Sequence, residues 1–213
     1  RGLNQWRKRF EYYLAAQDYI VVCVDSRGTN ARGRAFRNET YMHLGLKEAE
    51  DHICAAQYLQ TLPYVDGKRI AITGWSFGGF ESIMCLTKQP RVAAGETPLF
   101  KCGIAIAPVT TWRLYDSAYT ERYMRRPQVN DDGYNGSDLT RMAGDLQGKL
   151  LIVHGLADDN VHAQHTFLYT EALVQAGKQF EMQIYPDDNH FLRHRSNYEH
   201  LHRRLMLFLE NNL

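Results

Sequence analysis

Short apolar runs alternate with amphipathic stretches along most of the chain. The apolar runs have the length of β-strands and cover 20–24, 70–74, 102–107, 149–154 and 180–185. Helical spacing of apolar residues predicts helices over 4–17, 44–62, 77–88, 162–176 and 197–211. Strands that are apolar throughout are typical of a parallel sheet that is covered on both faces. The pattern therefore predicts one α/β domain, with helices on both sides of a mostly parallel sheet.

Two segments depart from this alternation. Residues 26–37 are rich in Gly, Arg and Asn and are predicted to form a loop. Residues 110–148 are rich in Tyr, Asp and Gly and show no clear period. Because long irregular segments in compact domains are usually functional, we expect this second segment to lie at the edge of a site.

Composition narrows the classes of protein that fit. The chain has 213 residues, of which 44% are hydrophobic, and 25 Lys plus Arg against 24 Asp plus Glu give a net charge of +1. This balance indicates a globular protein and argues against a nucleic-acid partner. Its apolar runs are shorter than the roughly 18 residues that cross a bilayer, so we predict no membrane segment in this chain. The four cysteines form no Cys-x-x-Cys pair, which favours free, buried thiols.

One motif carries the chemistry. Gly74-Trp75-Ser76-Phe77-Gly78-Gly79 lies directly after a predicted strand and directly before a predicted helix. A serine in such a turn projects its hydroxyl above the carboxyl edge of the sheet. The backbone N–H of Phe77 would then lie at a helix N-terminus, where it can donate to a developing oxyanion. The alternative is a glycine-rich corner that holds its serine by chance.

A nucleophilic serine needs a base that is oriented by an acid. Two loops at the carboxyl ends of predicted strands, 154–161 and 186–191, can supply both groups. His190 in the second loop is the candidate base. The first loop offers Asp158 or Asp159 as the acid, and spacing alone does not separate them.

Two further histidines have a spacing that superficially suggests metal ligands. His162 and His165 would lie one helical turn apart, but no clear third ligand accompanies them. We therefore predict neither a metal nor a cofactor.

Several of these motifs together resemble a known family. The segments 74–80, 154–161 and 188–190 are similar to the catalytic domain of the prolyl oligopeptidase clan, and most of all to its dipeptidyl peptidase IV branch. The resemblance extends over nearly the whole chain. Its most specific element is Tyr115-Asp116-Ser117-Ala118-Tyr119-Thr120-Glu121-Arg122-Tyr123, which ordinary esterases do not carry.

The resemblance implies an α/β-hydrolase fold whose first strands precede this chain, so that 1–213 is an N-terminally truncated catalytic domain. It also assigns Ser76 as nucleophile, Asp158 as acid and His190 as base, and it gives Asn160 a substrate carbonyl to bind. The pocket before the scissile bond would be lined by Phe77, Val109, Trp112, Tyr115, Tyr119 and Val161. From the residues alone, Tyr115 and Tyr119 would be one packing face of a helix.

The activity implied by the resemblance is a serine peptidase that releases N-terminal dipeptides with Pro or Ala at the penultimate position. The alternatives are a tripeptidyl or acylaminoacyl peptidase of the same clan, a carboxylesterase, or a non-catalytic accessory homologue. The resemblance also implies a peptide substrate, an N-terminal β-propeller outside this chain that supplies paired Glu residues, a homodimer, and export to the periplasm or cell surface. The family usually has Tyr where this chain has Phe77.

Overall fold

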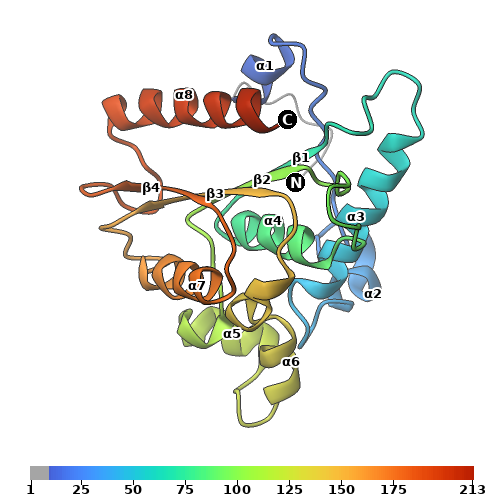
Figure 1. Ribbon diagram of the computed structural model, residues 1–213. Helices are drawn as coiled ribbons and strands as arrows, with labels where there is room; N and C mark the ends of the chain where they lie inside the picture. Colours follow the sequence, from blue (N-terminus) through green and yellow to red (C-terminus); the bar gives the residue numbers. More distant parts are fainter. Residues whose placement is uncertain (1–9) are drawn as a thin grey trace.

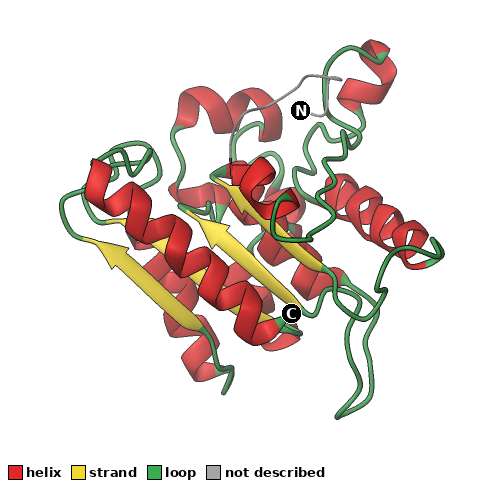
Figure 2. Cartoon of the chain, turned by 90° about the horizontal axis from the view of Figure 1, so that it is seen from above, coloured by secondary structure: helices red, strands yellow, loops and turns green. Residues whose placement is uncertain are grey.

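The computed structural model describes residues 10–213, apart from the side chain of Arg195. Its centre is a parallel sheet whose order follows the chain, β1-β2-β3-β4. The strands are β1 (Ala71–Trp75), β2 (Cys102–Ile106), β3 (Lys149–Gly155) and β4 (Glu181–Tyr185). Since all four run in one direction, their carboxyl ends meet at one edge (Figure 2). That edge is where open α/β sheets build their sites.

Helices cover both faces of this sheet (Figure 1). On one side lie α3 (Leu46–Gln60), α4 (Phe77–Lys88) and α7 (Gln164–Gln175). On the other lie α1 (Phe10–Ala15) and α8 (Arg195–Asn212). The predicted helices 44–62, 77–88, 162–176 and 197–211 therefore form with small shifts of their ends. Of the predicted helix 4–17, residues 4–9 lie outside the described residues.

The two faces of the sheet have separate hydrophobic cores. Leu150 and Ile152 of β3 pack into the core beneath α4, whereas Leu151 and Val153 pack into the core beneath α8. Successive side chains of a strand point to opposite faces, so a strand buried on both sides is apolar at every position. This explains why the apolar runs in the sequence are continuous.

The strand predicted over 20–24 is wrong. These residues form no strand, and Ile20, Val21 and Val22 are 56%, 40% and 48% exposed. A strand forms only when a neighbour satisfies its backbone N–H and C=O groups, and within the described residues no strand pairs with this segment. An apolar β-branched run therefore has the composition of a strand without the partner that would make it one.

The two segments predicted to be irregular contain short helices. Residues 26–37 include the start of α2 (Gly33–Asn38). Within 110–148 lie the 3-10 helix η1 (Trp112–Leu114), α5 (Ser117–Met124), α6 (Asp131–Gly136) and the 3-10 helix η2 (Leu139–Asp145). The side chains of Asp116, Asn130 and Asp138 accept hydrogen bonds from the first turns of α5, α6 and η2. Caps of this kind start a helix where the apolar period is too short to reveal it.

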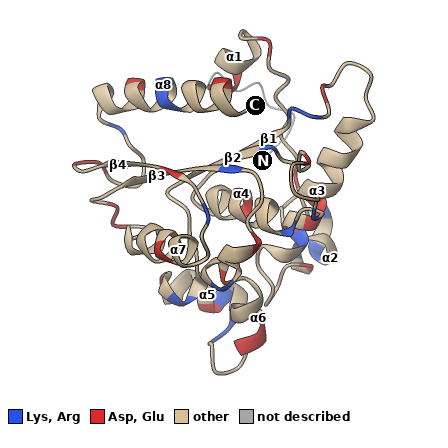
Figure 3. Ribbon diagram, in the orientation of Figure 1, with Lys and Arg blue, Asp and Glu red and all other residues tan. Residues whose placement is uncertain are grey.

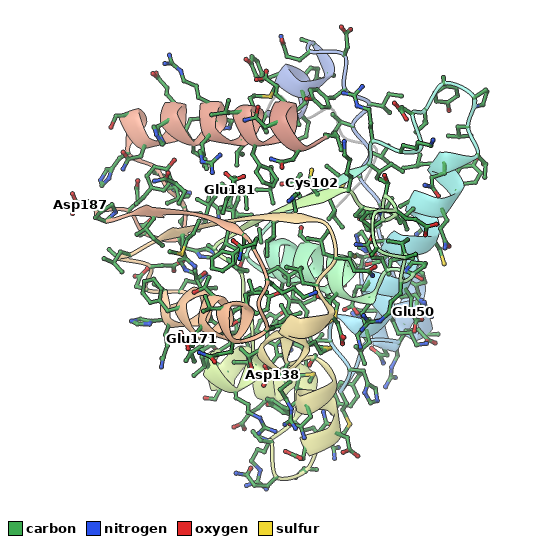
Figure 4. The ribbon with its side chains drawn as sticks, in the orientation of Figure 1. Glu50, Cys102, Asp138, Glu171, Glu181 and Asp187 are labelled. Atoms are coloured by element: carbon green, nitrogen blue, oxygen red, sulfur yellow. The ribbon has the colours of Figure 1, made fainter. Side chains whose placement is uncertain are left out.

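The cysteines divide evenly between core and surface. Cys85 and Cys102 are buried, and Figure 4 places Cys102 on β2 beneath α8. Cys23 and Cys54 are exposed, so the expectation of four buried thiols is wrong for these two. Cys23 belongs to the unpaired run 20–24, which explains its exposure.

Charged side chains of both signs are interspersed over the surface (Figure 3). Among the described helices, none combines the length and the apolar character that crossing a membrane requires.

Candidate active site

Ser76 stands at the turn between β1 and α4 in a strained conformation. Its backbone has φ +60° and ψ −118°, a region that residues with a side chain rarely adopt. The Ser76 amide donates to the carbonyl of Ile106 at 2.7 Å, and the Ser76 carbonyl accepts from the Phe80 amide at 3.0 Å. The turn is therefore held from both sides, and it presents Ser76 at the carboxyl edge of the sheet.

Two glycines make this turn possible. A Cβ added at Gly74 would overlap the backbone of Gly78, and one added at Gly79 would lie 2.9 Å from the carbonyl oxygen of Ile106. A Cβ at Gly78 itself would meet nothing within 4 Å. The close approach of strand and helix thus requires glycine at the positions two before and three after the serine.

Phe77 is the first residue of α4. The first four N–H groups of a helix have no partner within that helix, and the helix dipole favours negative charge beside them. The Phe77 amide therefore has the position predicted for an oxyanion donor. Its ring packs against Phe80 and Trp112, with centroids 5.7 Å away in both cases.

Asp158 and His190 lie on neighbouring loops and are hydrogen bonded. His190 Nδ1 lies 2.7 Å from Asp158 Oδ2, and both residues are buried. Asp159, which spacing did not exclude as the acid, is exposed. Since a carboxylate only accepts, the proton between them is on His190 Nδ1, which leaves Nε2 free to accept one.

Asp158 receives more than this one hydrogen bond. The amides of Asn160 and Val161 donate to Oδ1, both at 2.9 Å, and His154 Nε2 lies 3.2 Å from Oδ2. Burial by itself would raise the pKa of Asp158, but these donors outweigh it and hold the pKa well below its usual range. The carboxylate is therefore charged throughout the neutral range and holds the His190 ring in one orientation.

The loop that carries His190 is tied directly to the serine turn. The indole N–H of Trp75, the residue before Ser76, donates to the carbonyl of His190 at 2.8 Å. The two acidic residues just before Asn189 and His190 differ in exposure. Asp188 is buried and accepts from Asn197 Nδ2 at 2.5 Å, whereas Figure 4 shows Asp187 at the outer end of this loop.

A small aromatic cavity opens beside the serine. It has a volume of about 80 Å³ and is lined by Ser76, Phe77, Val109, Trp112, Tyr115 and Tyr119. Trp112 and Tyr119 are stacked with their centroids 5.9 Å apart, and the Tyr115 ring meets Tyr119 edge to face at 5.4 Å. Tyr115 precedes α5 and Tyr119 lies inside it, so the two do not form one face of a helix.

The two remaining predicted site residues lie around this cavity. Asn160 Oδ1 accepts a hydrogen bond from the Tyr115 hydroxyl at 2.8 Å, which links the acid loop to the cavity wall. Val161 is fully buried and does not line the cavity. The structure thus places nine of the ten predicted residues in or beside the cavity and the Asp158–His190 pair, whereas Val161, which was expected to line the cavity, does not.

The histidines considered as metal ligands have other partners. His165 is buried, and its Nδ1 accepts from the amide of Thr110 at 3.1 Å. His162 Nδ1 accepts from the amide of Gln164 at 3.2 Å. The described residues include no group of three or more ligands that could hold a metal ion.

Two side-chain contacts that matter to this geometry were not predicted from the sequence. Trp75 bonds to the loop that carries His190, and His154 contacts Asp158. His154 carries a signal that could have found it, because an imidazole inside an apolar strand must have polar partners. The bond made by Trp75 has no comparable signal, since it depends on how two distant loops meet.

Comparison with known proteins identifies one protein family and several relatives of similar sequence. The model of the prolyl oligopeptidase family matches residues 6–213. A probable dipeptidyl-aminopeptidase B of Grosmannia clavigera is 45% identical over 184 residues, which is 85% of this chain and 18% of that protein. A protein of the same name from Arthroderma gypseum is 44% identical over 205 residues, or 95% of this chain and 22% of that protein.

Solved structures agree in fold. The crystal structure of Porphyromonas gingivalis dipeptidyl peptidase 4 matches with a TM-score of 0.93 and 50% identity, over 99% of this chain and 29% of that one. A putative dipeptidyl aminopeptidase IV from Bacteroides ovatus matches with a TM-score of 0.88 and 37% identity, over 96% of this chain and 28% of that one. The predicted α/β-hydrolase fold class is confirmed. The chain spans about a fifth of the length of the curated relatives that it matches.

Proposed function

The chain belongs to the prolyl oligopeptidase family, and from this premise we propose that it carries the catalytic centre of a serine dipeptidyl peptidase. The substrate is a polypeptide with a free N-terminus and Pro or Ala at its second position. A single observation carries the proposal. Ser76, in its strained turn, lines the aromatic cavity of about 80 Å³.

In the proposed reaction, Ser76 Oγ attacks the carbonyl carbon that follows the second residue. His190 Nε2 takes the hydroxyl proton, and the Phe77 amide donates to the oxygen that becomes negative. The C–N bond then breaks, and His190 returns the proton to the leaving amine. A water molecule, which gives its proton to His190, then attacks the acyl-enzyme in the same way and releases the dipeptide. Asp158 keeps its charge throughout and stabilises the imidazolium that forms twice in each cycle.

The size and walls of the cavity support the choice of residue at the second position. Pockets for drug-sized ligands occupy about 300–1,000 Å³, so a cavity of about 80 Å³ suits one small side chain. Its walls are aromatic apart from Val109 and Ser76, and apolar burial of a ring or methyl group stabilises binding. Large or charged side chains fit neither the volume nor the walls.

The resemblance to the family adds further parts of the catalytic protein to the proposal. We expect a β-propeller in the same protein to bind the substrate's amino group, and the hydroxyl of a Tyr that follows one of the earlier strands to be the second oxyanion donor. We also expect a homodimer. Within this chain, we expect the side-chain amide of Asn160 to bind a substrate carbonyl, and its hydrogen bond with Tyr115 beside the cavity supports this role.

The test is turnover of a Gly-Pro chromogenic substrate by the protein as its gene encodes it. Replacing Ser76 with Ala should lower kcat by about 10⁴- to 10⁶-fold, as in other serine triads. Exposed Ser196, in the first turn of α8, provides the matched control, and Ser196→Ala should leave kcat unchanged. Equal turnover by wild type and Ser76→Ala would refute the assignment of the nucleophile.

A series of substrates separates the neighbouring activities. A dipeptidyl peptidase cleaves Gly-Pro and Ala-Ala derivatives, rejects the same peptides with an acetylated N-terminus, and releases no tripeptide. Preference for the acetylated peptide would indicate an acylaminoacyl peptidase, tripeptide release a tripeptidyl peptidase, and turnover of simple esters alone a carboxylesterase. Inactivity on the whole series would indicate an accessory homologue.

A further inference from the structure

His154 is a fully buried histidine at the end of a strand whose other buried residues are apolar. It is the sixth residue of β3, it follows Leu151, Ile152 and Val153, and its side chain has no exposed surface. An imidazole in such a place is costly unless its polar atoms find partners. Both ring nitrogens of His154 do find partners, and the partners come from the proposed active site and from the helix behind it.

The partners fix which nitrogen carries the proton. His154 Nε2 lies 2.8 Å from the carbonyl oxygen of Val161 and 3.2 Å from Asp158 Oδ2. A carbonyl and a carboxylate only accept, so the proton is on Nε2. Nδ1 lies 2.7 Å from Thr166 Oγ1, so the ring is held at both ends.

The Nε2–H group of His154 thus contacts both ends of the turn 158–161, which we call the acid turn. Asp158 begins this turn and Val161 ends it, and the Asp158 carboxylate accepts from the Val161 amide in return. Asp158 Oδ2 accepts from His190 on one side and contacts His154 Nε2 on the other. Rotation of the carboxylate would break contacts with both histidines at once.

We propose that His154 is a positioning residue, which orients the triad acid Asp158 and fixes the turn that also carries Asn160. The inference rests on the proposed function, because it concerns the efficiency of the same serine reaction. His154 touches neither substrate nor the reacting atoms. Its effect passes through Asp158 to the orientation of the His190 ring.

A positioning role and a merely structural role make different predictions. Loss of a buried contact lowers stability wherever it occurs, but it leaves kcat unchanged in the molecules that remain folded. Loss of the bond that orients the triad acid lowers kcat in folded molecules. Substrate binding in the aromatic cavity changes little, because His154 does not line it.

The experiment compares His154→Phe with His154→Gln in the protein as its gene encodes it. Phe keeps the ring and loses both nitrogens, and it should lower kcat by about 10- to 100-fold, the effect of losing a hydrogen bond to a charged group. KM should change by less than about threefold. The amide nitrogen of Gln reaches as far as Nε2 and donates as it does, so His154→Gln should recover most of kcat.

The matched control is His165→Phe, which removes a second buried histidine of the same region. His165 bonds to the Thr110 amide and makes no hydrogen bond to Asp158, so its replacement should reduce stability without this loss of kcat. Should His154→Phe not fold, Thr166→Val decides instead. It leaves the His154 ring in place and removes the hydroxyl that holds Nδ1, and kcat should fall about threefold or more.

Three results would overturn the proposal: wild-type kcat in folded His154→Phe or Thr166→Val, an equal loss in His165→Phe, or no recovery in His154→Gln. Failure of the proposed function is a separate result. It would appear as a wild-type protein that neither turns over the substrate nor reacts with a fluorophosphonate, whatever the state of residue 154.

Discussion

Two buried carboxyl groups in this molecule have opposite surroundings. Asp158 is 2% exposed and accepts hydrogen bonds from two backbone amides and from His190, with His154 beside it. Glu81 on α4 is 5% exposed, and within the described residues neither of its oxygens has a hydrogen-bond partner. Similarly buried carboxyl groups therefore have pKa values shifted in opposite directions, because donors stabilise the charge of Asp158 and no such donor contacts Glu81 within the described residues.

The surroundings of Glu81 make the contrast sharper. Burial and the neighbouring Glu48 both raise the pKa of Glu81 well above its ordinary value. Burial also raises the pKa of Glu48 to about 7, although Glu48 accepts from the Gly45 amide at 2.9 Å. Both effects favour the protonated form of Glu81, whereas the donors around Asp158 favour its charged form. A buried carboxylate with hydrogen-bond donors can hold a neighbouring histidine in one orientation, whereas a buried carboxyl group without them lowers the stability of the fold.

The largest predicted effect comes from removing the charge of the paired carboxyl. Asp158→Asn should lower kcat by about 10⁴-fold, because the amide presents a donor where His190 needs an acceptor and so favours the wrong tautomer. Steady-state kinetics on a Gly-Pro substrate measures the loss. The exposed neighbour supplies the control, and Asp159→Asn should stay within about twofold of wild type. Comparable losses in both variants would remove the distinction between the two aspartates.

The second effect is on stability, at the carboxyl without partners. Glu81→Met fills similar space without a polar group and should stabilise the α3–α4 pair by about 1–3 kcal/mol at pH 8. Glu81→Gln keeps an unpaired polar group and should gain less. Hydrogen exchange of peptides from α3 and α4 reports the local opening free energy. A lower opening free energy in Glu81→Met than in wild type would show that Glu81 has a stabilising partner.

The smallest effect is the dependence of that opening on pH. The Glu48 carboxyl has a folded pKa of about 7 against an ordinary 4.5, so the folded state binds more protons between these values. Its contribution is therefore complete below about pH 4.5 and lost as pH rises through 7. We expect the opening free energy of α3 and α4 to fall by about 1–3 kcal/mol from pH 5 to pH 8.

Asp158 should give the opposite trend. Its folded pKa is depressed, so its contribution is present above the ordinary pKa of 3.8 and lost as pH falls below it. Exchange in the peptide that contains 158–161 should accelerate below about pH 4, after correction for intrinsic rates. The same sign of pH dependence in both regions would contradict the assignment of their ionisation states.

The sequence predicts the parts of this molecule that depend on local order along the chain. Ser76, Asp158 and His190 follow the ends of β1, β3 and β4, and parallel strands bring those ends to one edge. The motif 74–79 was recognisable because both strand and helix flank it. Spacing did not separate Asp158 from Asp159, since both lie in the same turn, and only the structure shows that Asp158 is the one hydrogen bonded to His190.

Other features depend on partners that are distant in the chain. Residues 20–24 have the composition of a strand and lack a neighbouring strand among the described residues. The cap at Asp116 separates Tyr115 from the helix that carries Tyr119, although their spacing alone suggested one helix. Glu81 lies on α4, and the sequence does not show that the packing of α3 against α4 buries its carboxyl group without a hydrogen-bond partner among the described residues.

The most direct measurement of the central claim is the site at which a fluorophosphonate reacts with the protein as its gene encodes it. Mass spectrometry of the peptide that contains 74–79 should find one adduct on Ser76, with loss of activity in proportion to labelling. The adduct should be absent from Ser76→Ala and form far more slowly in Asp158→Asn. An active wild-type protein that carries no adduct, or carries it on another residue, would contradict the assignment of Ser76 as the nucleophile.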